Sequence, residues 1–249
     1  MTDTIGREFM RKSSHSNARP SPQSQGVPLP PLEVPYPPDA PLLHLPQQGD
    51  LPDPAVPLRT FIQQRVTVRK YRDQPLSVDE LAYLLWCTQG VKVIKRSITL
   101  RTVPSAGARH AFETYLLVNK VSNIKSGLYR YLALEHALLR MDFPAEICEQ
   151  VTDACLHQKH VADSAVTFLW VAVTERMEWG YPDRGYRYLH LDAGHVCQNL
   201  YLAAESIDCG VCAIAAFDDD ALNQAVRVDG ESMFVIYAAS LGKKTGRKN

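Results

Sequence analysis

The sequence has no excess of charge of either sign, because 27 lysines and arginines balance 27 aspartates and glutamates over 249 residues. A neutral chain has no overall field that would draw it to nucleic acid or to an anionic membrane. Apolar runs long enough to span a membrane are also missing, and the N-terminus MTDTIGREFMRK lacks the apolar core of an export signal. These absences predict a cytoplasmic protein without nucleic-acid or membrane partners.

Motifs that cradle phosphates or build common hydrolases are absent too. No GxGxxG follows a predicted strand, and neither a Walker lysine pattern nor a GxSxG elbow occurs. A Rossmann dehydrogenase, a nucleotide hydrolase and a serine hydrolase are therefore disfavoured. The six cysteines lie in apolar contexts, and a chain of this length buries a core without disulfides. We expect them to be reduced thiols.

Proline is scarce in most of the chain. Of 17 prolines, 13 lie between residues 20 and 57, and such segments favour the polyproline conformation. We predict an extended N-terminal arm over residues 1–58 and one folded domain over residues 59–249. The arm is either a disordered tail or a segment that lies along the body or a partner subunit. The second alternative rests on its apolar side chains, which exceed what a linker requires: Leu32, Val34, Tyr36, Leu42, Leu43 and Leu45.

The pattern after residue 58 is typical of a sheet with helices around it. Ser77 and Glu80 predict a capping box ahead of a short helix that ends at Gly90. Pro144 is expected in the first turn of another helix, and Asp218 at the cap of a third. Strands are predicted at 113–121, at the GLYRY and HALLRM pieces, and, as apolar runs covered on both faces, at 165–173 and 234–242.

The most regular segment is a long amphipathic helix predicted over residues 188–207. Its apolar stripe recurs at steps of four and three: Leu189, Ala193, Val196, Leu200, Ala203 and Ile207. The opposite, polar side carries Asp192, His195, Gln198, Asn199 and Glu205. Gly210 follows where a C-terminal cap belongs.

Two segments have the composition of a ligand site. In RVTVRKY, an extended conformation puts Arg65, Thr67 and Arg69 on one face and leaves Val66 and Val68 to pack on the other. Two arginine forks and a hydroxyl suit an anionic ligand with polar extensions, although a solvated edge strand has the same pattern. The second segment, TVPSAGARHAFETYLLV, places small residues where a flat ligand could approach the backbone closely.

A third segment, CGVCAIAAFDDD, raises the question of a metal or thiol-redox site. Zinc requires four convergent ligands, and no second CxxC or paired histidine is suitably spaced around Cys209 and Cys212. A thioredoxin-like pair stands at the start of a helix, whereas these cysteines lead from a helix into a strand. We predict packing roles for both cysteines and no metal site.

In this order, the three segments and the helix sequence DAGHVCQNLYLAAE resemble the SagB-type (SagB/ThcOx-like) branch of the FMN-dependent nitroreductase family, over about residues 58–244. The resemblance implies an α+β, nitroreductase-like fold with a central, mainly antiparallel sheet flanked by helices. It also implies a homodimer with FMN at the interface. Arg65 and Thr67 would hold the FMN phosphate and ribityl end, and Arg69 would approach the pyrimidine edge.

The same resemblance implies the remaining cofactor contacts. Pro104 and Ser105 match the loop that lies against the isoalloxazine ring. The Ala215 and Ala216 backbone matches the stretch from which an N–H reaches flavin N5, and Lys243 or Lys244 matches a basic phosphate contact.

The implied reaction is ping-pong hydride transfer through flavin N5, with NAD(P)H as a donor and a small organic or peptide-linked substrate. Tyr181 is the candidate catalytic residue, and Gly180 stands where azoline-forming oxidases have a lysine. Tyr186, Arg184 and Arg187 form either the mouth of the site or an ordinary polar loop. Two alternatives are a non-catalytic flavin- or partner-binding subunit of a tailoring complex and a CxxC metal or thiol-redox protein.

Overall fold

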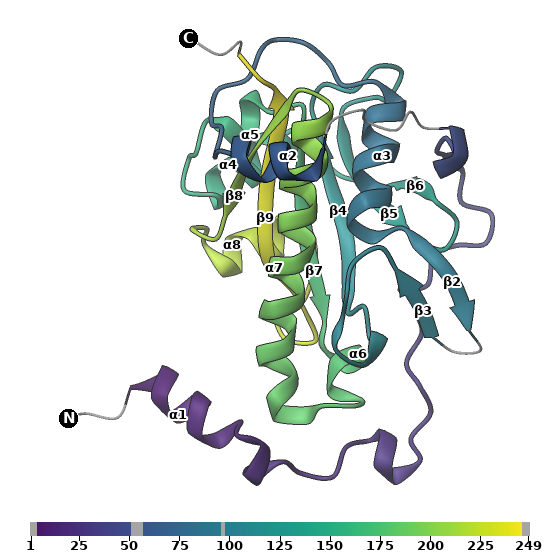
Figure 1. The fold of residues 1–249 in the computed structure, drawn as a ribbon, viewed down its shortest axis with the longest axis vertical. Coiled ribbons are helices and arrows are strands. Elements are labelled where there is room, and N and C mark those ends of the chain that lie inside the picture. Colours follow the sequence, from purple (N-terminus) through teal and green to yellow (C-terminus); the bar gives the residue numbers. More distant parts are fainter. Residues whose placement is uncertain (1–3, 51–56, 96–97, 246–249) are drawn as a thin grey trace.

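The structure, a computed structural model, describes residues 4–50, 57–95 and 98–245, and its centre is a seven-stranded sheet between helices (Figure 1). The strand order is β1-β6-β5-β4-β7-β9-β8, and every neighbouring pair is antiparallel. The strands are β1 (Leu42–His44), β4 (Phe112–Val118), β5 (Gly127–Leu132), β6 (Ala137–Arg140), β7 (Val166–Val173), β8 (Cys209–Ile214) and β9 (Met233–Lys243). A separate antiparallel pair joins β2 (Val91–Lys95) and β3 (Ile98–Arg101). The predicted α+β class and antiparallel sheet are confirmed.

Helices cover both faces of this sheet, and α1 (Ile5–Lys12) stands apart from it (Figure 1). The other helices are α2 (Leu58–Gln64), α3 (Val78–Gln89), α4 (Ile147–Ala154), α5 (His160–Asp163), α6 (Thr174–Glu178), α7 (Pro182–Ser206) and α8 (Asp219–Ala225). Single 3-10 turns lie at His15–Asn17, Gln23–Gln25, Gln48–Asp50 and Ala106–Ala108. Among the described residues, no helix is both long and apolar enough to cross a bilayer.

The apolar core is double because successive side chains of a strand point to opposite faces. Phe168 and Trp170 of β7 pack in the core beneath α3 and α7. Leu169 and Val171 belong to the second core, beneath α4 and α8. All of β7 is buried, which confirms the expectation that an uninterrupted apolar run marks a strand covered on both faces.

Most helix ends lie where the sequence places them. The Ser77 hydroxyl accepts from the Glu80 N–H at 3.1 Å, the Glu80 carboxylate accepts from the Ser77 N–H at 3.0 Å, and Gly90 caps the other end of α3. Asp218 caps α8. The expectation for Pro144 is wrong, because Pro144 precedes α4 and its carbonyl accepts from the Ile147 N–H at 3.2 Å in the turn that leads into the helix.

The long helix α7 starts earlier than predicted and ends differently. It begins at Pro182, where a fixed φ and the missing N–H suit a first helical position. The C-terminal cap predicted at Gly210 is wrong. Asp208 takes the left-handed conformation there, with φ 55°, and Gly210 lies inside β8. Gly210 serves a close contact instead, because a Cβ built on it would lie 2.6 Å from the Val68 Cβ.

The described part of the N-terminal arm lies along the body of its own chain, and α1 projects beyond the start of α7 (Figure 1). The Gln23 N–H donates to the Trp179 carbonyl at 2.8 Å, and the Trp179 indole donates to the Val27 carbonyl at 2.8 Å. Further along, β1 pairs with β6, and the Leu45 side chain is buried.

A buried ion pair anchors the middle of the arm. Arg176 Nη2 donates to Glu113 Oε1 at 2.6 Å, and both side chains are at most 4% exposed. The same two side chains bind the arm backbone, because Arg176 donates to the Pro31 carbonyl and Glu113 accepts from the Val34 N–H. The charges thus satisfy backbone groups that a polyproline segment leaves without ladder partners.

Candidate functional site

The arginine segment 65–71 is extended and lies against the outer edge of β8. Thr67 forms a parallel bridge with Val211, and the Val68 N–H donates to the Val211 carbonyl at 2.9 Å. Val68 packs against Gly210, as expected for the packing face. Val66 does not pack, because 57% of its side chain is exposed. The packing prediction is therefore correct for Val68 and wrong for Val66.

Arg65 and Thr67 meet the C-terminal half of α7 at one side chain. The Arg65 guanidinium lies over the Tyr201 ring, 5.2 Å from its centroid, and the Thr67 hydroxyl is 3.3 Å from the Tyr201 hydroxyl. The Tyr201 hydroxyl also accepts from the Ala213 N–H at 3.0 Å. Tyr201 therefore ties the arginine segment to β8. The sequence showed Tyr201 only as one residue of the long helix.

The two C-terminal lysines have different partners. Lys244 pairs with Glu205 of α7 and is half-buried. Lys243 is buried, and its ammonium pairs with Glu80 and donates to the Ile207 carbonyl at 3.0 Å. Lys244 therefore lies on the part of α7 that Arg65 and Thr67 contact, whereas the ammonium of Lys243 is already held inside the fold.

Arg69, Ala215 and Ala216 are exposed at the same end of β8. Arg69 is close enough to the His160 imidazole to lower its pKa, after the larger effect of burial. Ala215 and Ala216 directly follow Ile214, the last residue of β8. A cationic side chain and a stretch of backbone with small side chains are therefore presented together.

The Pro104 and Ser105 loop is held by the other half of α7. The Ser105 hydroxyl donates to Asp192 Oδ2 at 2.6 Å, and the Ala106 N–H contacts the same carboxylate at 3.3 Å. Asp192 is only 5% exposed, because this loop covers its position on the polar side of the helix. Burial raises the pKa of Asp192, although the Ser105 bond opposes that shift.

Two other members of the predicted polar side are also engaged. Asn199 donates to the Cys87 carbonyl at 2.8 Å, and the Glu205 carboxylate is taken by Lys244. His195 and Gln198 remain exposed, as predicted. The polar side of α7 is therefore largely an attachment surface for neighbouring segments.

One chain does not bring all the predicted cofactor residues together. Thr67 contacts Tyr201, whereas Ser105 contacts Asp192, nine positions earlier on α7 (201 − 192 = 9). At 1.5 Å per residue, these anchor points lie about 14 Å apart along the helix. The arginine segment and the Pro104 and Ser105 loop therefore form two separate half-sites.

Tyr181 lies beside the loop half-site. Its ring packs edge-to-face on Tyr188 with centroids 5.0 Å apart, and a Cβ on Gly107 would lie 2.7 Å from its hydroxyl. The two arginines predicted near a site mouth bind the arm, and Arg184 also lines the cavity beside Tyr181. Arg184 donates to the Ser13 carbonyl at 3.0 Å, and Arg187 donates to the Ser13 hydroxyl at 2.8 Å.

A cavity of about 360 Å³ lies between Tyr181 and the arm. It is bounded by the start of α7 and by the arm between Lys12 and Ser24. Arg19 closes part of its rim through an ion pair of 2.6 Å with Asp183. An arm lying along the body was one of the two predicted alternatives, and its position beside Tyr181 is a finding of the structure.

The two cysteines of CGVC cannot act as a pair. They stand three positions apart in β8, so their side chains point to opposite faces. Cys209 is fully buried, and burial raises its pKa to about 12, while the pKa of Cys212 is also raised by burial. No group of three or more metal-ligating side chains occurs among residues 4–50, 57–95 and 98–245.

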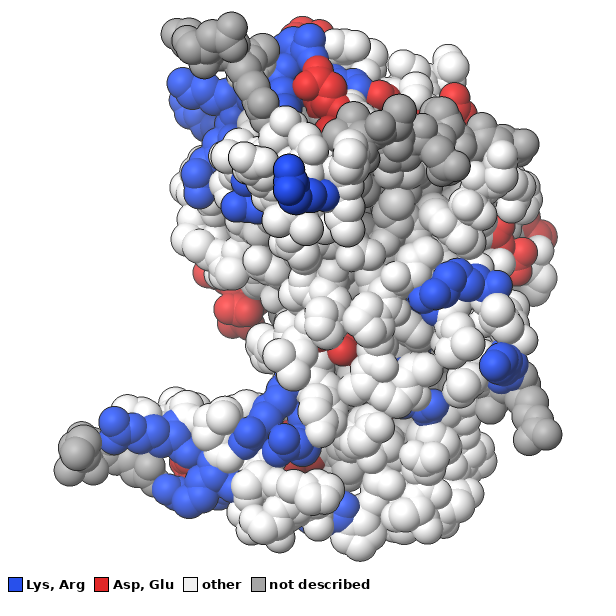
Figure 2. All heavy atoms as spheres, in the orientation of Figure 1, with Lys and Arg blue, Asp and Glu red and all other residues white. Residues whose placement is uncertain are grey.

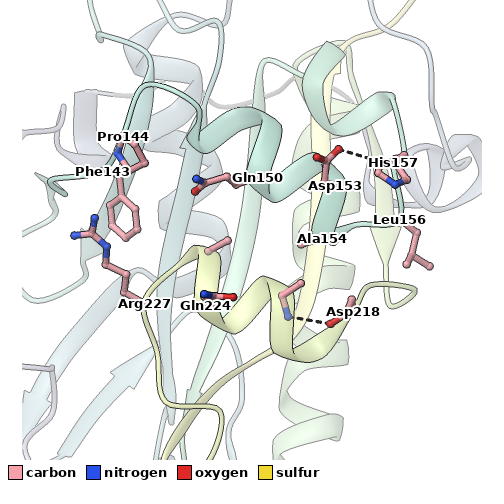
Figure 3. Close-up of a pocket in the computed structure, with 12 residues that line it drawn as sticks. Phe143, Pro144, Gln150, Asp153, Ala154, Leu156, His157, Asp218, Gln224 and Arg227 are labelled. Atoms are coloured by element: carbon pink, nitrogen blue, oxygen red, sulfur yellow. Dashed lines mark hydrogen bonds and ion pairs between the residues drawn. The ribbon is translucent and has the colours of Figure 1, made fainter.

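The largest cavity, about 910 Å³, lies elsewhere, between α4 and α8 (Figure 3). Arg227 stacks on Phe143 at one end of it, 4.4 Å from the ring centroid, and His157 pairs with Asp153 at the other. None of the predicted cofactor residues lines it. The other cavity of note is a shallow apolar one of about 450 Å³ between α2, α3 and α7.

The face that carries α2 and α7 has few charged side chains along its middle (Figure 2). Large apolar side chains are exposed on these two helices and in the arginine segment: Leu58, Ile62, Val66 and Leu191 are each more than half exposed. Scattered apolar residues are normal on a surface, but a group beside an apolar cavity is typical of a surface that another protein covers.

Comparison with known proteins gives a family for this arrangement. The sequence profile described as the Nitroreductase family matches residues 62–243. A protein of Methanocaldococcus jannaschii that is assigned as a nitroreductase is 33% identical over 179 residues, which are 72% of this chain and 88% of the relative. The trifolitoxin-processing protein TfxB of Rhizobium leguminosarum is 29% identical over 109 residues, 42% of this chain but only 29% of that protein.

Solved structures show the same fold. A nitroreductase-type protein of Anabaena variabilis is 31% identical with a TM-score of 0.64, over 76% of this chain and 38% of that one. The Escherichia coli microcin synthetase McbBCD complex has a similar chain, with 17% identity, a TM-score of 0.62 and coverage of 97% and 92%. A Desulfovibrio desulfuricans protein solved with FMN has 16% identity, a TM-score of 0.55 and coverage of 78% and 92%.

Proposed function

The chain belongs to the nitroreductase family, whose similar solved structures include an FMN complex, and from this premise we propose that it is an FMN-dependent oxidoreductase of the SagB type. The observation that carries the proposal is the convergence of Arg65, Thr67 and Lys244 on one end of α7, beside the exposed backbone that follows β8. A cytoplasmic location, and the division into an arm over 1–58 and a domain over 59–249, are parts of the same proposal.

The residues present fit FMN. Arg65 and Thr67 offer a guanidinium and a hydroxyl on one face of an extended segment, as a phosphate and a ribityl chain require. Lys244 adds a second cation, and we assign the phosphate contact to it in preference to Lys243, because its partner Glu205 lies one turn after Tyr201 on α7, whereas Lys243 pairs with Glu80 of α3. Arg69 stands next to the exposed Ala215 and Ala216 segment, where a flat ring system has access to the backbone.

Bound FMN would supply hydride transfer through N5, taken from a donor such as NAD(P)H and passed to a second substrate in ping-pong order. Arg69 would place positive charge at the pyrimidine edge and so favour the reduced, anionic ring. The backbone of Ala215 and Ala216 would offer an N–H close to N5. Tyr181, Tyr188 and the arm would shape the space in which the second substrate lies.

A homodimer would complete the site. The arginine segment and the Pro104 and Ser105 loop are anchored about two and a half turns apart on α7, hence on opposite sides of it, so a ligand that needs both would take them from two chains. The uncharged face of α2 and α7, with Leu191 exposed, supports pairing of two copies at this surface (Figure 2). In this arrangement, Tyr181 acts on the cofactor held by the partner's arginine segment.

A peptide-linked substrate is the class that the comparisons favour. Two of the similar proteins carry names for toxin-processing or microcin synthesis, and the microcin complex contains a truncated precursor. The cavity between Tyr181 and the arm has space for a side chain, not for a folded protein. We propose a small organic molecule or a peptide side chain as the substrate, held beside Tyr181.

The first experiment is identification of the cofactor. The purified protein should be yellow and should release near-stoichiometric FMN on heating. Arg65→Ala and Arg69→Ala should lose FMN, whereas Arg59→Ala, which changes an exposed arginine of α2, should retain it. A colourless wild-type protein that takes up no added FMN would refute the proposal.

A second candidate function is a non-catalytic flavin- or partner-binding subunit of a tailoring complex. The similarity to a chain of the microcin complex favours it, because that chain functions within an assembly. Steady-state turnover with NADH or NADPH and a quinone or nitro acceptor separates the candidates. Turnover by the isolated protein supports the enzyme, and bound FMN without turnover on either nucleotide supports the subunit.

A further inference from the structure

A continuous series of hydrogen bonds runs through buried side chains behind β8. The Tyr71 hydroxyl lies 2.8 Å from Ser240 Oγ, which lies 2.9 Å from His160 Nδ1. His160 Nε2 lies 3.2 Å from Gln158 Oε1, and Gln158 Nε2 donates to the Ala216 carbonyl at 2.8 Å. The series therefore connects the end of the arginine segment to the backbone that follows β8.

The hydrogen positions along the series follow from its acceptors. The Gln158 amide nitrogen donates to two carbonyls, those of Cys155 and Ala216, both at 2.8 Å, so the amide oxygen must be the acceptor that faces His160. His160 Nε2 therefore carries the hydrogen, and Nδ1 of the neutral ring accepts from the Ser240 hydroxyl. A reversed amide would set its oxygen against two carbonyl oxygens.

The surroundings keep this imidazole neutral. His160 is 7% exposed, and burial, followed by the positive charge of Arg69, lowers its pKa, while Asp163 acts in the opposite direction. The Cys212 sulfur lies 3.9 Å from Nε2, and burial raises the pKa of that thiol. A neutral ring has one donor and one acceptor, which is the pair that this position uses.

We propose that His160 is a positioning residue of the redox site, acting through Gln158 to fix the backbone of Ala215 and Ala216. The inference rests on the proposed function, in which this backbone meets the flavin ring. Tyr71 continues the series, because the Ser240 hydroxyl donates to His160 and so accepts from the Tyr71 hydroxyl at 2.8 Å. His160 thus acts on the backbone that follows β8, while Tyr71 joins the arginine segment to the same Ser240.

The local structure around Ala215 and Ala216 shows why this backbone needs a restraint. The antiparallel ladder of β8 ends at the pair of Ile214 and Ala238, so Ala215 and Ala216 lie beyond it. Their methyl side chains are exposed and contribute little packing. A segment with few buried contacts opens readily. The bond from Gln158 to the Ala216 carbonyl restrains it from the buried side.

The test compares four variants. His160→Leu removes both ring hydrogen bonds, His160→Gln keeps an N–H donor directed at Gln158, and Gln158→Leu removes the bond to Ala216. The matched control is His157→Leu, since this exposed histidine of the same turn bonds to Asp153 and has no bond to the series. Amide hydrogen exchange of Asp218, whose N–H donates to the Ala154 carbonyl at 2.8 Å directly after this segment, is measured in the FMN-free protein, and the Kd for FMN is measured by titration.

His160→Leu and Gln158→Leu should each raise exchange at Asp218 and weaken FMN binding by about threefold, the net effect of one typical hydrogen bond lost at an exposed carbonyl. His160→Gln should restore both values to near wild type, and His157→Leu should change neither. Wild-type exchange in the two leucine variants would overturn the inference. If His160→Leu does not fold, the half-buried Gln158→Leu decides the outcome.

The tautomer of the His160 ring is a second measurement, and a general loss of stability does not change it. Imidazole ¹⁵N shifts should show His160 protonated on Nε2, and protonation on Nδ1 instead would overturn the inference. Exchange and tautomer need no cofactor. A protein that binds no FMN but shows both expected signals would therefore refute the proposed function while supporting the positioning role of His160.

Discussion

The Ser105 hydroxyl donates to Asp192 at 2.6 Å, and this bond joins the predicted flavin loop to the middle of the long helix. The carboxylate is buried and, among the residues that the structure describes, the Ala106 N–H is its second hydrogen-bond donor. A buried carboxylate with two neutral donors is costly to keep charged.

The charge on Asp192 should make stability depend on pH. Burial raises its pKa above the unfolded value, so the folded state binds the proton more tightly. The stabilisation that comes from this tighter proton binding is fully present below the pKa that Asp192 has in the unfolded chain. It is lost as pH rises through the pKa of Asp192 in the folded protein. Asp192→Asn should therefore flatten the fall of unfolding free energy above that pH, as measured by urea denaturation across a pH series. Asp183→Asn, at an exposed carboxylate, is the control; an unchanged slope in Asp192→Asn would contradict the assignment.

Substitutions of the two C-terminal lysines should differ in their effect on FMN binding. Lys243→Met leaves Glu80 without its buried partner, and breaking such a pair costs about 3 kcal/mol. Lys244→Met should cost a similar amount of stability, because it removes the partner of the 3% exposed Glu205, and should in addition weaken FMN binding, because Lys244 lies on the part of α7 that Arg65 and Thr67 contact. Denaturation midpoints and FMN titrations measure the two effects. A larger loss of FMN affinity in Lys243→Met would reverse the assignment.

Gly210→Ala should displace the arginine segment. The added Cβ would lie 2.6 Å from the Val68 Cβ, and both atoms belong to backbone-fixed positions, so one strand must move. We expect lower FMN affinity with the rest of the sheet intact. Gly6→Ala, at a glycine with open space around it, is the matched control. FMN titration and circular dichroism together check the result, and wild-type affinity in Gly210→Ala would show that the contact tolerates a methyl group.

The cysteines of CGVC should be dispensable. A Cys209→Ala and Cys212→Ala double variant should keep its FMN, because the backbone of the segment and not its sulfur faces the site. In the native protein, Cys209 should resist alkylation at pH 8, since burial raises its pKa to about 12. Mass spectrometry after iodoacetamide treatment measures this. Loss of FMN in the double variant would revive a thiol or metal role.

Mixed dimers should test the two-chain site. Arg65→Ala changes one half-site and Ser105→Ala the other, so each variant alone has two defective sites per dimer. Co-refolding of the two variants should give mixed dimers with one intact site, because the unaltered halves meet there. FMN content that rises on mixing supports the arrangement; FMN content equal to the average of the two parents argues that each site is built from one chain.

Much of the fold could be predicted because its signals are local. The capping box at Ser77 and Glu80 and the apolar run of β7 depend on neighbours a few residues away, and both lie as expected. The prediction of a helix cap at Gly210 was wrong because a glycine after a helix is consistent both with a cap and with a close contact between strands. Only the position of Val68 in space separates these two roles.

The candidate site was less predictable because its supports are distant in sequence. Ser105 and Asp192 are 87 positions apart, and Gln158 and Ala216 are 58 apart. No periodic pattern indicates such pairs. Asp192 has the helical position of a solvated residue, and only the loop that packs over it makes it buried. Tyr201 and His160 were missed for the same reason.

The N-terminal region also protects the sheet from its own hydrogen-bonding capacity. An unpaired outer strand is a template for another chain and a route to aggregation. Here β1 lies beyond β6 at one margin of the sheet, and Thr67 and Val68 lie beyond β8 at the other. Both covering pieces come from the first 70 residues: β1 lies inside the proline-rich stretch, and Thr67 and Val68 follow it. A shortened chain would then precipitate before it lost its cofactor, so poor solubility of truncated forms would report on uncovered strands and not on chemistry.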